Sequence, residues 1–179
     1  MTERVTLGPA SEDDLTVLLE LTQDPETAGE FTWAGWSDLR YWRRRWDENG
    51  LIGPDGGVLM VVRNDEPVGM VSWRARQTGA VSRYWEMGIG LLPQVRGQGY
   101  GTEAHRLVAR YLFAHTTVHR VEAVTEAGNI AEQKALENAG FAREGVRRGS
   151  LWRDGAWRDE VLYSVLRTDP PVCRADHYC

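Results

Sequence analysis

The stretch Leu91-Leu-Pro-Gln-Val-Arg-Gly-Gln-Gly-Tyr-Gly-Thr-Glu-Ala104 decides how the rest of the chain is interpreted. Its glycines at 97, 99 and 101 stand between an apolar segment typical of a strand and an amphipathic segment typical of a helix. Glycine lets the backbone approach a ligand closely and adopt torsions that other residues avoid. Amide groups at the positive end of the following helix would then face outward, which predicts an anion site suited to a pyrophosphate. The plainer alternative is a tight turn that needs glycine for its shape alone.

Three kinds of phosphate-binding loop carry glycines in a similar position. A Walker loop requires a lysine after its last glycine, and this stretch has none. A Rossmann loop requires Gly-x-Gly-x-x-Gly between parallel strands, with an acidic residue about 20 positions later. Here the spacing is Gly-x-Gly-x-Gly, the preceding strands are hairpin-like, and Glu122 opens a strand instead of closing one. The third pattern, Gln/Arg-x-x-Gly-x-Gly/Ala, fits Gln94, Gly97 and Gly99.

That third pattern is the loop of the GNAT acetyltransferase superfamily, and the run Glu86–Ala104 resembles its RimJ/RimL-type branch. A second block, Asn129–Phe141, resembles the Asn…Gly-Phe helix of that branch, and residues 144–163 resemble its final strands. The resemblance covers residues 4–167. It implies an α/β GNAT fold, with a mixed, mostly antiparallel twisted sheet of about seven strands flanked by about four helices.

Local patterns indicate the same mixed architecture. Strands are expected over 4–7, 58–62, 68–73, 84–92, 120–125, 146–152 and 160–166, and helices from about 11, from about 37, over 104–112 and over 131–139. We expect a single domain over residues 1–168 and a disordered tail over 169–179.

The amino-acid composition is typical of a globular domain and gives no sign of nucleic-acid binding or of membrane insertion. The chain has 179 residues, of which 42% are apolar and 26% charged, and a net charge of −5, as in an ordinary globular domain. It has no long basic run, so no nucleic acid is expected, and no apolar run long enough to cross a membrane. Its two cysteines, Cys173 and Cys179, do not staple the body of the fold, which favours a reducing, cytoplasmic compartment. The alternative, a metal site with His177 in the tail, lacks a second ligand pair, and no metal is expected.

The resemblance implies that acetyl-CoA is the co-substrate, and it also implies which residues contact the cofactor. In GNAT enzymes, a strand end separates from its neighbour just before the glycine loop, and the pantetheine arm pairs with the exposed backbone. Asn129 is then a pantetheine ligand or, more plainly, a helix cap. The implied cofactor-binding residues are Leu91, Leu92, Gln94, Arg96, Gly97, Gln98, Gly99, Tyr100, Gly101, Thr102, Asn129 and Lys134.

The chemistry is the attack of a neutral amine on a thioester, which calls for a base and for an acid that protonates the leaving thiolate. Glu86 matches an acidic position of the branch and is the candidate base; the alternative is an exposed strand glutamate. Glu132 is the candidate acid, although it equally fits a surface residue of a first helical turn. The family often has a tyrosine at the position of Leu136 and a serine at that of Glu132, so this chain departs from both.

The sequence gives less information about the amine that accepts the acetyl group. In the branch, the first two helices and their loop cover the acceptor, which here implies Glu30, Trp33 and Trp36, with Tyr163 as a further candidate that is more plainly a core residue. Aromatic faces and carboxylates suit a cationic amine, although the tryptophans also fit simple packing of a helix on the sheet. We expect an N-acetyltransferase for a protein N-terminus or a small amine, and a homodimer by family likeness. The alternative is a non-catalytic acyl-CoA-binding protein.

Overall fold

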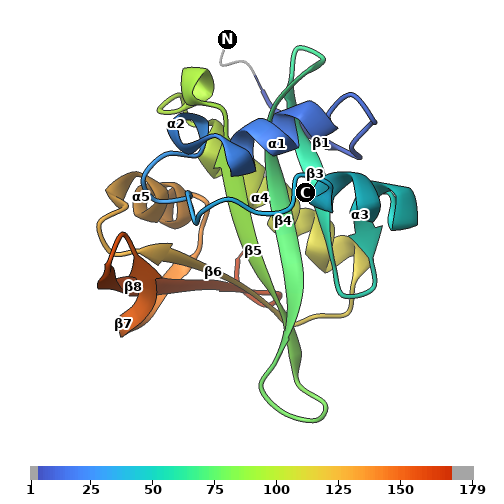
Figure 1. Ribbon diagram of the computed structural model, residues 1–179. Helices are drawn as coiled ribbons and strands as arrows, with labels where there is room; N and C mark the ends of the chain where they lie inside the picture. The colour runs from blue at the N-terminus through green and yellow to red at the C-terminus, as the bar shows by residue number, and fades with distance from the viewer. Residues whose placement is uncertain (1–3, 171–179) are drawn as a thin grey trace.

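The computed structural model describes residues 4–170, which form one open mixed sheet with helices on both faces (Figure 1). The strands follow the order β1-β3-β4-β5-β6-β8-β7, and β2 pairs with β3 outside this path. Neighbouring strands are antiparallel except for β5 and β6. The strands are β1 (Thr6–Gly8), β2 (Ile52–Gly53), β3 (Gly56–Arg63), β4 (Glu66–Gln77), β5 (Arg83–Leu91), β6 (Arg120–Glu126), β7 (Ala142–Arg153) and β8 (Ala156–Leu166). The predicted mixed, mostly antiparallel sheet is confirmed.

The helices divide between the two faces of this sheet. Within residues 4–170 they are α1 (Leu15–Gln23), α2 (Pro25–Ala28), α3 (Tyr41–Asn49), α4 (Tyr100–His115), α5 (Ile130–Asn138) and the short 3-10 helix η1 (Pro93–Val95). In Figure 1, α1 to α3 lie in front of the sheet and α4 lies behind it. The apolar stripe of α4, including Ala104, Val108 and Leu112, joins Val71 of β4 and Leu136 of α5 in the main buried cluster.

The shortest α-helix, α2, and the shortest strand, β2, are not predicted from the sequence. They raise the totals among the described residues to eight strands and five α-helices, against about seven and four expected. Elements of four and two residues are too short to show a periodicity. Capping chemistry does mark α2, because Asp24 accepts a hydrogen bond from the Thr27 amide at 2.9 Å and Pro25 occupies the first turn.

The parallel strands β5 and β6 separate part-way along their length. Their register holds three pairs, the last of which joins Met87 to Ala123. Beyond this pair, residues 88–91 of β5 continue along β4, and residues 124–126 of β6 continue along β8. Figure 1 shows β5 and β6 close together at one end and far apart at the other. Among the described residues, no strand pairs with the two edges that face each other here.

The expected tail over 169–179 lies, apart from its first two residues, outside the described residues. The same is true of Cys173, His177 and Cys179.

Candidate functional site

The site is built around the strand gap, by which we mean the facing edges of residues 88–91 in β5 and 124–126 in β6. Backbone N–H and C=O groups along such edges need hydrogen-bond partners. An extended ligand that carries amide groups can supply them in the manner of an added strand. The gap can therefore hold a chain-like, amide-bearing ligand.

The glycine loop and the start of α4 follow directly from the end of β5. Gly97 and Gly99 have φ angles of +75° and +86°, a region that strains other residues. A side chain at either position would meet no atom within 4 Å, so the surface here is open. Gly99 is the N-cap of α4, whose first amide groups have no acceptor inside the helix. The arrangement suits an anion at the open end of the strand gap.

The other residues predicted to bind the cofactor differ in how much of each is accessible to a ligand. Leu91 lies partly buried at the end of β5, and Leu92 and Tyr100 are buried in the main core. Tyr100 can therefore offer a ligand only its backbone. Gly101 lies where three elements converge, because a Cβ there would be 3.8 Å from the Leu91 side chain and 3.9 Å from that of Ala135. Six further members of the set are exposed or half-buried, namely Gln94, Arg96, Gly97, Gln98, Gly99 and Thr102.

Arg96 makes hydrogen bonds to backbone carbonyls that the sequence does not predict. Its Nε donates to the Leu91 carbonyl at 2.9 Å, and its Nη2 donates to the carbonyls of Thr27 and Ala28. The guanidinium thus ties the end of α2 to the end of β5. In this structure the guanidinium is engaged by backbone carbonyls, and a role of Arg96 toward the pyrophosphate stays a prediction.

Asn129 and Lys134 lie on the far side of the gap. Asn129 is the N-cap of α5, where its Oδ1 accepts a hydrogen bond from the Glu132 amide at 3.2 Å. The plainer interpretation of Asn129 as a helix cap is therefore correct, and a second role toward pantetheine stays a prediction. Lys134 is exposed on α5.

Glu86 lies on β5 immediately before the last parallel pair, on the sheet face opposite to the buried Trp85 and Met87. Its carboxylate accepts hydrogen bonds from Arg74 at 2.7 Å and from Arg76 at 3.1 Å, and its side chain is 14% exposed. Burial alone would raise the pKa of Glu86, but the hydrogen bonds from the two arginines outweigh it and lower the pKa. Such a carboxylate is a weak base, better suited to orienting a water or an amine than to removing its proton alone.

Glu132 lies in the first turn of α5 and meets a buried histidine of α4. Its Oε1 is 2.9 Å from Nε2 of His105, whose side chain is 0% exposed. The family's tyrosine position is occupied by Leu136, which is fully buried in the main core. Glu132 is therefore the acidic side chain that the first turn of α5 presents.

The predicted acceptor residues Glu30, Trp33 and Trp36 belong to the segment between α2 and α3, which we call the crossing loop (residues 29–40). In Figure 1 this loop passes in front of β5 and β4. Trp33 and Trp36 form an edge-to-face pair with ring centroids 5.6 Å apart, and Trp36 is 81% exposed. The packing interpretation holds instead for Trp42 and Trp46. They join α3 to a second buried cluster, which includes Leu18 of α1 and Met60 of β3.

Arg153, at the end of β7, anchors the crossing loop. It donates to the carbonyls of Glu30 (2.9 Å), Phe31 (2.8 Å) and Trp33 (2.6 Å), and its Nε donates to Glu126 at 2.9 Å. Glu126 is the last residue of β6. Arg153 therefore fixes the loop to one strand of the gap, while Arg96 fixes α2 to the other.

Tyr163 has a position that argues against contact with an acceptor. Its side chain is 0% exposed in the main core, and its hydroxyl donates to Glu137 at 2.9 Å. The plainer interpretation of Tyr163 as a core aromatic residue is therefore the one that fits, and it takes no part in the function proposed below.

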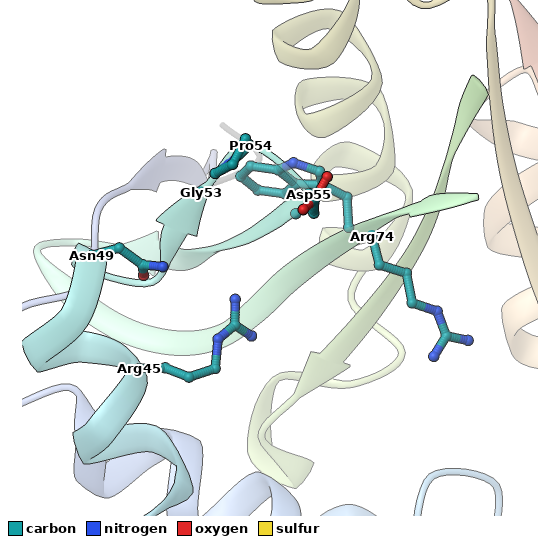
Figure 2. Close-up of a pocket in the computed structure, with 8 residues that line it drawn as sticks. Arg45, Asn49, Gly53, Pro54, Asp55 and Arg74 are labelled. Carbon is teal, nitrogen blue, oxygen red and sulfur yellow. The ribbon is translucent and has the colours of Figure 1, made fainter. Parts of the chain in front are cut away.

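A surface pocket of about 350 Å³ opens between α3 and the sheet, on the same face as Glu86. Figure 2 shows Arg45 directed into it from α3 and the Arg74 guanidinium directed away. That guanidinium reaches Glu86, so the pocket adjoins the carboxylate. The lining residues are Arg45, Asn49, Gly53, Pro54, Asp55, Gly56, Trp73 and Arg74.

Several contacts of the site are not predicted from the sequence. They are those of Arg74, Arg76, Arg153 and His105, together with the hydrogen bonds from Arg96 to α2. Each joins two different elements, so local periodicity gives no sign of it. One weak signal exists: the 2-residue alternation of β4 places Arg74 and Arg76 on one face, where a strand carboxylate would meet them.

A separated parallel strand pair, a glycine loop and a helix N-terminus in this order have a direct counterpart among known proteins. The model of the acetyltransferase (GNAT) domain matches residues 4–142. The chain belongs to the GNAT acetyltransferase family.

Relatives of this GNAT chain point to the RimJ/RimL-type branch. It is 32% identical to "Probable N-acetyltransferase YjcK" of Bacillus subtilis over 62% of this chain and 61% of that protein. It is 29% identical to [Ribosomal protein uS5]-alanine N-acetyltransferase of Escherichia coli over 67% of this chain and 57% of that protein. The match thus spans about three fifths of these relatives. Mycobacterium smegmatis RimJ, in complex with CoA-disulfide, shares the fold with a TM-score of 0.74 and 23% identity, covering 91% of this chain and 82% of RimJ.

Within residues 4–170, no helix has both the length and the apolar character to cross a membrane. In the same range, no three His, Cys, Asp or Glu side chains gather as a metal would require.

Proposed function

We propose that this GNAT chain is an N-acetyltransferase that moves the acetyl group of acetyl-CoA to a primary amine held beside it in a ternary complex. The separation of β5 from β6 beyond Met87, with the glycine loop at its open end, carries this proposal. The gap offers unpaired backbone to the two amides of a pantetheine arm, and the start of α4 offers amides to a pyrophosphate. The N-acetyltransferase names of its relatives and the CoA bound to RimJ support the same assignment.

The direction of the cofactor follows from this geometry. The pyrophosphate belongs at the open end, near residues 97–102, and the thioester at the closed end, near Met87 and Gly88. Glu86 would then adjoin the acetyl group from the face covered by α1 to α3. Because Arg74 and Arg76 hold its carboxylate, we propose that Glu86 orients the amine or a water and accepts the amine's surplus proton through that water.

The charges beside Glu86 bear on the acceptor. Arg74, Arg76 and the pocket residue Arg45 place three positive charges near one carboxylate, Glu86, and an excess of positive charge disfavours a polycation. We therefore favour an acceptor with a single amine, such as a peptide α-amino group, over a polyamine. The name of the Escherichia coli relative, which specifies an alanine of a ribosomal protein, agrees with a peptide acceptor. Trp33 and Trp36 would flank it from the crossing loop, and a homodimer stays a prediction.

The test is thiol release from acetyl-CoA over a panel of short peptides with free N-termini, aminoglycosides and polyamines, with the acetylated product identified by mass. We expect release with peptides or monoamines and little with polyamines. Tight acetyl-CoA binding with no release on any amine would instead favour the non-catalytic, acyl-CoA-binding alternative, which the absence of a hydroxyl at Leu136 motivates.

A further inference from the structure

The contact between α4 and α5 contains a buried histidine, His105, whose ring lies edge-to-face with Phe141. His105 is 0% exposed, and neither ring nitrogen has a hydrogen-bond partner among the described residues. Its Nε2 lies 2.9 Å from Oε1 of Glu132, within ion-pair distance but without the alignment of a hydrogen bond. A buried polar group left unsatisfied costs about 1–3 kcal/mol, so an apolar residue would serve helix packing better. Such a group calls for an explanation in function.

The pair lies on two helix faces that meet beside the strand gap. Gly101 is one turn before His105 on α4, and Ala135 is three residues after Glu132 on α5, so each pair shares a helix face. A Cβ on Gly101 would touch both Ala135 and Leu91, the last residue of β5. The helix faces that hold His105 and Glu132 therefore meet beside the strand gap. The Glu132 side chain is 22% exposed, so it reaches from the buried ring toward the surface.

We propose that Glu132 donates a proton to the departing CoA sulphur and that His105 positions it, an inference that rests on the proposed acetyl transfer. The amine nitrogen bonds to the thioester carbon, the carbon–sulphur bond breaks, and its electron pair stays on sulphur. The carboxyl proton of Glu132 passes to that sulphur, giving the free thiol. The Nε2–H of His105 and the positive end of α5 then stabilise the carboxylate. The amine's surplus proton leaves through Glu86 and water, and solvent reprotonates Glu132 after CoA departs.

His105 is thus a positioning residue and Glu132 the catalytic one. The pair replaces the hydroxyl that the buried Leu136 does not supply.

The location of Glu132 can be tested without knowing the acceptor. In a chain with Cys173 and Cys179 changed to Ser, Glu132→Cys is incubated with CoA disulfide, and the mixed disulfide is followed by intact mass. The control is Ala131→Cys, an exposed neighbour about 100° around the same helix. We expect Glu132→Cys to be labelled at least about tenfold faster and desulfo-CoA to block the labelling, as required of a side chain near the sulphur. Equal labelling of the two variants would overturn the proposal, even if the wild type acetylates amines.

The role of His105 is tested by turnover on an amine identified in the panel. We expect Glu132→Gln to lower kcat about 100-fold and His105→Leu about tenfold, with unchanged acetyl-CoA affinity. His105→Gln, whose amide N–H can replace Nε2–H, should recover most of the loss, and the double variant should be no slower than Glu132→Gln alone. His115→Leu, an exposed histidine on the same helix, is the control. Losses that multiply in the double variant, or His105→Gln as slow as His105→Leu, would contradict the pairing.

Discussion

Replacing Arg153 with Met removes the anchor of the crossing loop. The guanidinium makes three hydrogen bonds to loop carbonyls and one to Glu126, and both charged side chains are nearly buried, at 13% and 12% exposure. Four charge-assisted hydrogen bonds at about 1.5–3 kcal/mol each would sum to about 6–12 kcal/mol. The real loss is smaller, because the loop can detach, hydrate its carbonyls and regain about 1–2 kcal/mol of backbone entropy per residue. Breaking one buried pair costs about 3–5 kcal/mol, so we expect a loss of about 3 kcal/mol in unfolding free energy.

Urea unfolding measures this loss directly. With a slope of about 2 kcal/mol/M, a loss of this size shifts the midpoint by about 1.5 M. The matched control is Arg158→Met, on the same hairpin, whose Nε is 4.0 Å from the same carboxylate and whose side chain is 46% exposed. It should lose less than about 0.5 kcal/mol. The Arg153 variant should also raise KM for the acceptor and leave acetyl-CoA affinity intact. If the two variants unfold alike, Arg153 does not anchor the loop.

Three further outcomes are expected. Glu86→Gln should lower kcat about 100-fold with little change in acetyl-CoA affinity, and unchanged kcat on a turned-over amine would remove Glu86 from the chemistry. By calorimetry, Gly99→Trp should weaken acetyl-CoA binding at least about 100-fold by blocking the approach to α4, whereas Gly155→Trp, with a similar φ of +73° and equally open surroundings, should not. Arg120 lowers the pKa of Glu144 to about 2, so the stability this adds is present above about pH 4.5 and lost toward pH 2. Because Glu144 is 36% exposed, the wild type should exceed Glu144→Gln by at most about 1–2 kcal/mol near pH 6 and by nothing near pH 2; a constant difference in urea titrations at several pH values would refute this.

Local chemistry accounts for the parts of the fold and site that the sequence predicts. The alternation along β5 and the apolar stripe of α4 are each buried on one face, so the period of 2 or 3.6 residues identifies them. The strand β3 is identified differently, as a continuous apolar run that is buried over residues 56–61. The glycine loop is predicted for a similar reason, because glycine is the residue that most readily adopts the positive φ found at Gly97 and Gly99. The resemblance to the GNAT family then gives the strand separation, which no local pattern contains.

What the sequence does not predict depends on contacts between distant segments. Arg153 binds carbonyls about 120 residues earlier in the chain, and a backbone carbonyl leaves no mark in a sequence. His105 lies in an apolar stripe, so its sequence context predicts an ordinary packed residue. Only the fold shows that Glu132 lies beside it. The tryptophans show the same limit. Trp42 packs in the core and Trp36 is exposed, although both come from one aromatic-rich stretch.

The central claim is that acetyl-CoA occupies the gap between β5 and β6. Amide hydrogen exchange at single-residue resolution tests it most directly. Adding acetyl-CoA should slow exchange at residues 88–91, where the edge of β5 has no strand partner, and at residues 97–102 around the start of α4. Exchange in β7 and β8, on the far side of β6, should not change. Protection at 97–102 without any at 88–91 would contradict the account, because it would place an anion at the helix but no pantetheine arm in the gap.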